Sequence, residues 1–184
     1  MGTDLTVRAA TQDDLGGIAA IYNHEVSHGI STFDLQPPPV TYWQDRLAST
    51  QDSDHLLVAV EADHVVGYAH SSSYRPRPAY AHTRETSIYL DPSARGRGIG
   101  RVLYPALLDE VAASGVHTVV ALVALPNPSS VRLHRAVGFK PAGTMREVGY
   151  KFDRWIDIAW YDLLLSCWAS NDAAGGPVRS RRRR

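Results

Sequence analysis

A glycine-rich segment, Arg95-Gly96-Arg97-Gly98-Ile99-Gly100, separates a predicted strand at 85–90 from a predicted helix at about 100–114. Glycines at the start of a helix let backbone N–H groups approach a bound anion, and the helix N-terminus adds positive potential. No Lys-Ser or Lys-Thr follows, as a Walker loop requires, and Arg101 replaces the last glycine of the dinucleotide fingerprint. The segment therefore predicts either a different kind of phosphate-binding loop or a plain tight turn.

Hydrophobic periodicity predicts an α/β fold around this loop. Thr11 and Asp14 resemble a helix cap, and residues 118–125 are almost wholly apolar, which is typical of a central strand buried on both faces. The order of elements indicates a mixed sheet flanked by helices. The strands are expected at 5–9, 55–61, 65–73, 85–90, 118–125, 145–149 and 158–165, and the helices after residue 14, around 42–47, and at 100–114 and 129–137.

Length and composition indicate one globular domain. The chain has 184 residues, of which 44% are hydrophobic, so we expect a domain over 1–170 and a disordered Arg-rich tail over 171–184. The single cysteine, Cys167, excludes an internal disulfide and a Cys-based zinc finger. No run reaches the roughly 20 apolar residues of a membrane span, and the first residues do not resemble an export signal. We expect a cytoplasmic protein with no membrane partner.

The charge balance argues against a broad nucleic-acid surface. Basic and acidic residues number 19 each, but five of the basic ones lie among the last six positions, so the rest of the chain is acidic. The tail itself is compatible with contact to nucleic acid or anionic lipid, or with a solvated terminus.

Two motifs together carry a family resemblance. The pattern Arg95-x-x-Gly98-x-Gly100 after the strand resembles the pyrophosphate loop of the GNAT N-acetyltransferases, which bind acetyl-CoA. A second family block runs from Asn127 to Gly138-Phe139. The family usually has Tyr where this chain has His134, and His there is a feature of the phosphinothricin N-acetyltransferases. Residues 5–165 resemble that subfamily, with matching segments at 21–24, 31–33, 79–80, 85–90, 125–127, 130–134 and 148–152, and at Trp155 and Asp157.

This resemblance implies a GNAT fold and a defined reaction. The amine of a small amino acid analogue, phosphinothricin or methionine sulfoximine, would attack acetyl-CoA directly, without an acyl-enzyme and without a metal. A different small amine or amino acid is the alternative acceptor. The relatives also imply a homodimer.

The resemblance further assigns roles to individual residues. Glu85 is expected to take the ammonium proton, and His134 to act as a second base or to protonate the sulfur; an exposed strand-end Glu and a core histidine are the structural alternatives. The substrate site is expected to include Phe33, from the same or a neighbouring subunit, and Arg75, Arg77 and Tyr80, for which a solvated loop is the alternative. The expected cofactor-binding residues are Ile88, Tyr89, Leu90, Arg95, Gly96, Arg97, Gly98, Ile99, Gly100, Arg101, Asn127 and Ser130.

A second motif indicates a rival function. His24-Glu25-Val26-Ser27-His28 is a complete H-E-x-x-H, which on a helix would present two zinc ligands and a general base. Gly29 follows at once and suggests that the helix ends there, and no third ligand is marked downstream. A zinc hydrolase using His24, Glu25 and His28, and a nucleic-acid-binding module using the tail, are the alternatives from other classes.

Overall fold

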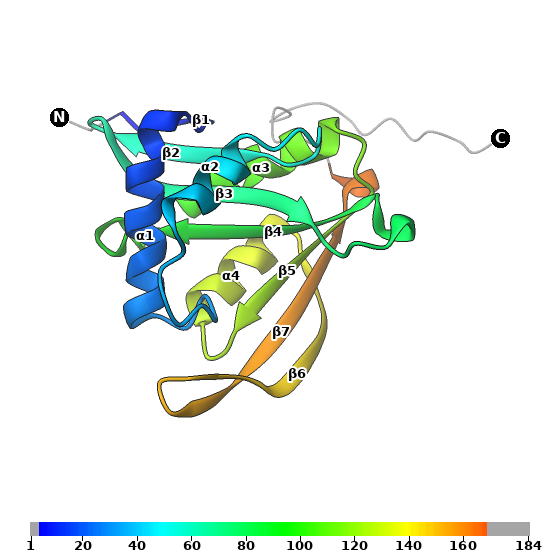
Figure 1. Cartoon of the computed structure of the whole chain (residues 1–184). Coiled ribbons are helices and arrows are strands. Elements are labelled where there is room, and N and C mark those ends of the chain that lie inside the picture. The colour runs from blue at the N-terminus through cyan, green and yellow to red at the C-terminus, as the bar shows by residue number, and fades with distance from the viewer. Residues whose placement is uncertain (1–3, 169–184) are drawn as a thin grey trace.

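Seven strands form one mixed sheet in the order β1-β2-β3-β4-β5-β7-β6 (Figure 1). The computed structural model describes residues 4–168, so the expected tail at 171–184 lies outside the described residues. β4 and β5 run parallel and all other pairs are antiparallel. The strands are β1 (Thr6–Ala9), β2 (Leu56–Glu61), β3 (His64–Ser73), β4 (Thr83–Leu90), β5 (Thr118–Ala124), β6 (Lys140–Lys151) and β7 (Arg154–Leu164).

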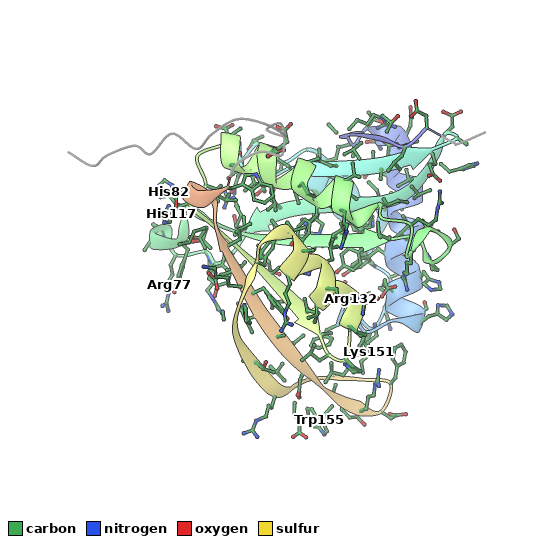
Figure 2. All side chains as sticks on the ribbon, turned by 180° about the vertical axis from the view of Figure 1, so that it is seen from behind. Arg77, His82, His117, Arg132, Lys151 and Trp155 are labelled. Atoms are coloured by element: carbon green, nitrogen blue, oxygen red, sulfur yellow. The ribbon has the colours of Figure 1, made fainter. Side chains whose placement is uncertain are left out.

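Four α-helices cover the two faces of this sheet. α1 (Leu15–His28) and α2 (Val40–Leu47) lie on one face, and α3 (Gly100–Ala113) and α4 (Pro128–Val137) lie on the other, as the front and back views show (Figures 1 and 2). Each face has its own apolar core, one around Leu103 and Leu107 of α3, the other around Ile18 and Trp43 of α1 and α2. The predicted order of elements and the α/β class are confirmed. Within residues 4–168, no helix combines the length and apolar character that crossing a membrane requires.

The two central parallel strands separate after three residue pairs. Thr83, Arg84 and Glu85 of β4 pair with residues 118–120 of β5, and no pairing follows. The expectation that 118–125 is buried on both faces is therefore wrong at Leu122, which is 37% exposed. Beyond the split, the edge of β5 that pairs with β4 at residues 118–120 has no strand beside it and borders a cavity instead.

β6 and β7 form a long two-stranded arm that leaves the body of the sheet (Figure 1). The predicted strands at 145–149 and 158–165 are too short. Pro141 and Gly143 disfavour strand structure in a sequence reading, but β6 is an edge strand, where the missing proline N–H costs little. The register shifts between Pro141 and Gly143, which accommodates both residues within the strand.

The tip of the arm is tied back to α1. Lys151 Nζ, at the end of β6, donates to the carbonyl of Thr32 at 2.9 Å and to that of Glu25 at 3.2 Å. Burial lowers the pKa of this lysine. The contact closes the arm over the segment that joins α1 to α2.

Candidate active site

A cavity of about 610 Å³ occupies the split between β4 and β5. The β4 residues that line it begin at Thr86, one residue after the last pair with β5. The end of β5, the glycine-rich loop, α3, α4 and two residues in or just after α1 contribute the remaining wall. The cavity is lined by Glu25, Ser31, Thr86, Ser87, Ile88, Tyr89, Leu90, Arg95, Gly96, Gly98, Gly100, Arg101, Leu122, Val123, Ala124, Asn127, Ser129, Ser130, Arg132, Leu133 and His134.

The loop presents backbone rather than side chains to this cavity. Gly96 and Gly98 have φ of +79° and +85°, a region that side-chain-bearing residues rarely adopt. A Cβ at either position would meet no atom within 4 Å, so the space beside the loop is open. The N-terminus of α3 has no side-chain cap. These features fit the binding of a phosphate group by backbone N–H donors.

The arginines around the loop have different partners. Arg95 binds the carboxylate of Glu25 and also reaches the carbonyl of Leu90 at 3.4 Å. Arg97 forms a bidentate pair with Glu61 on β2, at 2.7 and 2.9 Å, and does not line the cavity. Arg101 of α3 and Arg132 of α4 do line it, so two helices bring positive charge to its rim (Figure 2). Ile99 is buried in the core.

A chain of hydrogen bonds runs from α4 to β4 along the cavity. His134 Nδ1 lies 2.8 Å from the carbonyl of Ser130, which can only accept, so Nδ1 carries the hydrogen. Nε2 lies 3.2 Å from the hydroxyl of Tyr104, which in turn lies 2.9 Å from the hydroxyl of Thr86. Burial lowers the pKa of His134. The neutral ring therefore accepts from Tyr104, which accepts from Thr86.

The side chain of Asn127 caps the N-terminus of α4. Asn127 Oδ1 accepts a hydrogen bond from the Ser130 N–H at 3.0 Å, and both residues line the cavity. Asn127 thus acts as the turn and cap residue that its place before Pro128 suggests, with its side chain at the cavity wall. Gly138 ends the helix at φ +112°.

Glu85 lies at the point where β4 and β5 part, on the opposite face from Thr86. Thr86 faces α3 through Tyr104, so the preceding side chain projects toward α1 and α2. Burial raises the pKa of Glu85, while the positive charges of Arg46 and Arg75 oppose this effect. Glu85 does not line the cavity itself but precedes Thr86, which does. A carboxylate with a raised pKa is suited to accept a proton.

The remaining expected substrate residues surround this face of the split. Arg75 stacks over the ring of Tyr74, which contacts Tyr80 and Trp160 edge-on. Arg77 lies at the outer edge of the same loop (Figure 2).

Phe33 packs against the arm, and among the described residues no ring contact joins it to the loop of Tyr74 and Tyr80. Its ring lies where a side chain on Gly149 of β6 would be, so glycine is needed there. The segment joining α1 to α2 is thus fixed to the arm of the same chain by both Phe33 and the contact of Lys151 with Thr32.

The H-E-x-x-H motif is arranged differently from a zinc site. His24 and His28 stack at 4.7 Å between ring centroids, and α1 ends at His28. Glu25 is buried on another face, bound to Arg95. Among the described residues, no group of three or more His, Cys, Asp or Glu is arranged to hold a metal ion.

Comparison with known proteins decides the family. Residues 7–160 match the model of the acetyltransferase (GNAT) domain. A phosphinothricin N-acetyltransferase from Streptomyces coelicolor is 43% identical over 163 residues, covering 86% of this chain and 95% of the relative. The chain belongs to the GNAT family of acetyltransferases.

Two further GNAT relatives support this assignment. The L-methionine sulfoximine/L-methionine sulfone acetyltransferase of Salmonella typhimurium is 34% identical over 183 residues, covering 92% of this chain and 99% of the relative. The crystal structure of a phosphinothricin acetyltransferase from Sinorhizobium meliloti in complex with acetyl-CoA superposes with a TM-score of 0.84, at 36% identity, covering 95% and 93% of the two chains. These relatives confirm the predicted fold and the acetyl-CoA-dependent class, and they give the zinc-hydrolase alternative no support.

Some residues in or beside the cavity were missed by sequence reasoning. The motif presents Glu25 only as a metal-site base, yet Glu25 lines the cavity and binds Arg95 of the glycine-rich loop. Arg132 also lines the cavity and lies within the helix expected at 129–137, so a helical reading could have found it. Tyr104 follows Gly100 closely but meets His134 only in the folded chain. Arg46 and His70, which contact each other, are far from the motifs in sequence.

Proposed function

We propose that this GNAT enzyme transfers the acetyl group of acetyl-CoA to the α-amine of a small amino acid analogue of the phosphinothricin or methionine sulfoximine type. The observation that carries the proposal is the position of Glu85, a carboxylate with a raised pKa in the last residue pair before β4 and β5 part, next in sequence to the cavity-lining Thr86. The named activities of the relatives support the choice of acceptor.

Acetyl-CoA fits the cavity at the split. Backbone N–H groups of Gly96, Gly98 and Gly100 would hold its pyrophosphate, and the free side of β4 at Ile88, Tyr89 and Leu90 would hold its arm and supply a backbone donor to the acetyl oxygen. When bound, acetyl-CoA supplies an acetyl thioester whose carbonyl carbon the neutral amine attacks, releasing the thiol. Arg101 and Arg132 would bind the outer phosphate; Arg97 could do so only by leaving Glu61.

Glu85 is the proposed base. The acceptor amine arrives protonated at neutral pH and must lose a proton before it can attack. Glu85 would receive that proton directly or through a water molecule. The cations of Arg46 and Arg75 oppose the rise that burial causes in the pKa of Glu85 and so favour its ionised form.

His134 has a different proposed role. Both of its nitrogens already have partners, Ser130 and Tyr104, so it is less suited than Glu85 to take the amine proton. The chain of His134, Tyr104 and Thr86 would instead pass on the proton that the attacking amine loses as the amide forms. Uptake of that proton at His134 Nε2 would reverse both hydrogen bonds, so that the Thr86 hydroxyl, at the cavity wall, could donate to the departing sulfur.

The aromatic loop would receive the rest of the acceptor. Arg75 and Arg77 supply cations for a phosphinate or other polar tetrahedral head, and Tyr80 and Phe33 supply apolar walls. Arg75 acts electrostatically on Glu85, which favours it over Arg77 as the nearer cation.

The arm is the proposed surface of a homodimer. Large apolar side chains on β6 and β7 are exposed, above all Trp155 at 62%, and Figure 2 shows Trp155 at the far end of the molecule. Met145, Val148, Tyr150 and Phe152 are each about half exposed on the same arm. Such a patch marks an interaction site. Trp155→Glu should yield a monomer in light scattering, whereas Val102→Glu on α3 should not; a monomeric wild type would contradict the dimer.

A thiol-release assay tests the function. Purified enzyme is incubated with acetyl-CoA and a panel of amines that includes phosphinothricin, methionine sulfoximine, natural amino acids and simple alkylamines. The two analogues should give the highest kcat/KM. Preference for an unrelated amine would favour the alternative acceptor class and contradict the proposed one.

A further inference from the structure

Arg46 on α2 is a half-buried cation held in place by neutral groups. Its Nη1 donates to His70 Nδ1 at 2.8 Å, and its Nη2 donates to the hydroxyl of Tyr42 at 2.9 Å, while its guanidinium lies over the Tyr42 ring. Because an arginine can only donate, His70 Nδ1 must be the acceptor, and His70 is neutral. Burial and Arg46 both lower the pKa of His70.

Arg46 takes part in no ion pair within residues 4–168. The ion pairs there join Arg8 to Asp14, Arg84 to Asp54, Arg95 to Glu25 and Arg97 to Glu61. The Nε of Arg46 is enclosed without a hydrogen-bond partner. The described residues place no carboxylate within ion-pair distance of this half-buried cation, so an anionic ligand would supply the charged partner that it lacks.

Arg46 lies over the part of the sheet that contains Glu85. His70 stacks on Tyr68, which contacts Trp43, so these side chains share the face that α2 covers. On β3 and β4, His70 pairs with Ser87, and Ser72 pairs with Glu85, so His70 and Glu85 are diagonal neighbours on this face. Arg46 is also the largest charge acting on Glu85.

We propose that Arg46 binds the α-carboxylate of the acceptor and is the residue by which the enzyme distinguishes an amino acid from the corresponding simple amine. In an α-amino acid the amine and the carboxylate share one carbon, so a cation beside the base meets the carboxylate when the base meets the amine. The inference rests on the proposed function only in using Glu85 as the base. Arg75, on the loop between β3 and β4, is then left for the acidic head of the side chain.

Matched pairs of acceptors test this role. Each pair consists of an amino acid and the amine that remains after removal of its carboxylate: phosphinothricin with aminopropyl methylphosphinate, and leucine with isoamylamine. The enzyme and its Arg46→Gln variant are assayed with both members. For the amino acid, Arg46→Gln should lower kcat/KM about 10- to 100-fold, the range of a charge-assisted bond. For the amine the loss should be clearly smaller, because it reflects only the effect of Arg46 on the pKa of Glu85, and the KM for acetyl-CoA should stay constant.

Three further variants sharpen the result. Tyr42→Phe keeps the ring and removes one anchor of Arg46, so it should give a smaller loss with the same selectivity. Arg75→Gln should weaken both phosphinate acceptors equally and should weaken the leucine pair less, because only the effect of Arg75 on Glu85 remains there. Arg135→Gln, the same chemical change on the exposed side of α4, should have no effect, and thermal melting checks that every variant folds.

The outcomes separate this inference from the proposed function. If the wild type acetylates leucine but neither phosphinate acceptor, the proposed acceptor class fails while the leucine pair still tests Arg46. Equal losses on both members of a pair in Arg46→Gln, or a wild type that does not prefer the amino acid in either pair, would overturn the role of Arg46.

Discussion

The guanidinium of Arg95 binds the carboxylate of Glu25, which lies seventy residues earlier in the chain. Arg95 belongs to the glycine-rich loop, and Glu25 belongs to the last turns of α1, so this pair fixes the loop to the opposite layer of the fold. The Glu25 side chain lies over Gly29, where a Cβ would overlap the carboxylate. The residue that resembles the base of a zinc motif is thus an anchor of the glycine-rich loop, which we propose binds acetyl-CoA.

This contact predicts the effect of Gly29→Ala. The added methyl should displace the Glu25 carboxylate, lower stability by about 1–3 kcal/mol as overpacking does, and raise the KM for acetyl-CoA. Gly16→Ala in the same helix is the matched control, since a Cβ there meets no atom within 4 Å. It should stabilise by about 0.5–1 kcal/mol without a change in KM. Identical kinetics for the two variants would remove Glu25 from the anchoring role.

A second pair of glycines tests backbone binding of phosphate. Gly98 and Gly115 have φ of +85° and +79°, and a Cβ at either would lie in open space, but only Gly98 lines the cavity. Alanine should therefore cost each position a similar backbone strain, about 1 kcal/mol. Gly98→Ala should raise the KM for acetyl-CoA and Gly115→Ala should not. Steady-state kinetics at saturating acceptor provide the comparison. A similar KM for acetyl-CoA in both variants would contradict phosphate binding by the backbone of this loop.

Glu85→Gln should separate activity from stability. Because glutamine cannot accept the amine proton, kcat should fall about 100-fold or more at neutral pH. The KM for acetyl-CoA should stay near the wild-type value. In the wild type, kcat/KM should fall as the pH drops through the raised pKa of Glu85. A variant with wild-type rates would exclude Glu85 as the base.

The same substitution has an opposite effect on folding. The pKa of Glu85 is higher in the folded than in the unfolded chain, so stability is lost as pH rises above the ordinary Glu value. Glu85→Gln should therefore raise Tm at pH 7–8, and the difference should vanish near pH 4. Thermal melts across this range, read against the wild type, check the sign; a lower Tm at neutral pH would contradict it.

The hydrogen-bond chain at His134 predicts coupled effects. Tyr104→Phe removes the hydroxyl between His134 and Thr86 with little change in volume, and it should lower kcat without raising the KM of the acceptor. His134→Asn should act in the same direction. If both residues serve one proton path, the double variant should be no slower than the slower single variant. Multiplicative losses would indicate two separate roles.

The chain's local signals predicted the fold well because each depends on neighbouring residues. Gly98 and Gly100 after an apolar strand located the loop, and Asn127 with Gly138 bounded α4 correctly. The length of β6 was missed because Pro141 disfavours a strand unless the strand is known to be an edge. Edge position is a property of the whole sheet.

The candidate site was predicted less completely, because many of its contacts depend on how distant segments pack in the whole fold. Glu85, His134 and the loop follow from the order of motifs along the chain. The partners of these residues do not: Arg46 faces Glu85 only because α2 crosses β3, and Arg97 is drawn to Glu61 across the sheet. The H-E-x-x-H motif shows the converse, since its spacing is complete but Glu25 faces Arg95 instead of a metal.

Product analysis tests directly whether the enzyme transfers an acetyl group to the proposed acceptors. Wild-type enzyme, acetyl-CoA and phosphinothricin or methionine sulfoximine are incubated together, and the N-acetylated product is measured by mass spectrometry against the free thiol released. We expect equal amounts of N-acetyl product and thiol for at least one of the two analogues. With Glu85→Gln, we expect neither the N-acetyl product nor the thiol to form at an appreciable rate. Thiol release that does not depend on the amine, or no N-acetylated product from either analogue, would contradict it.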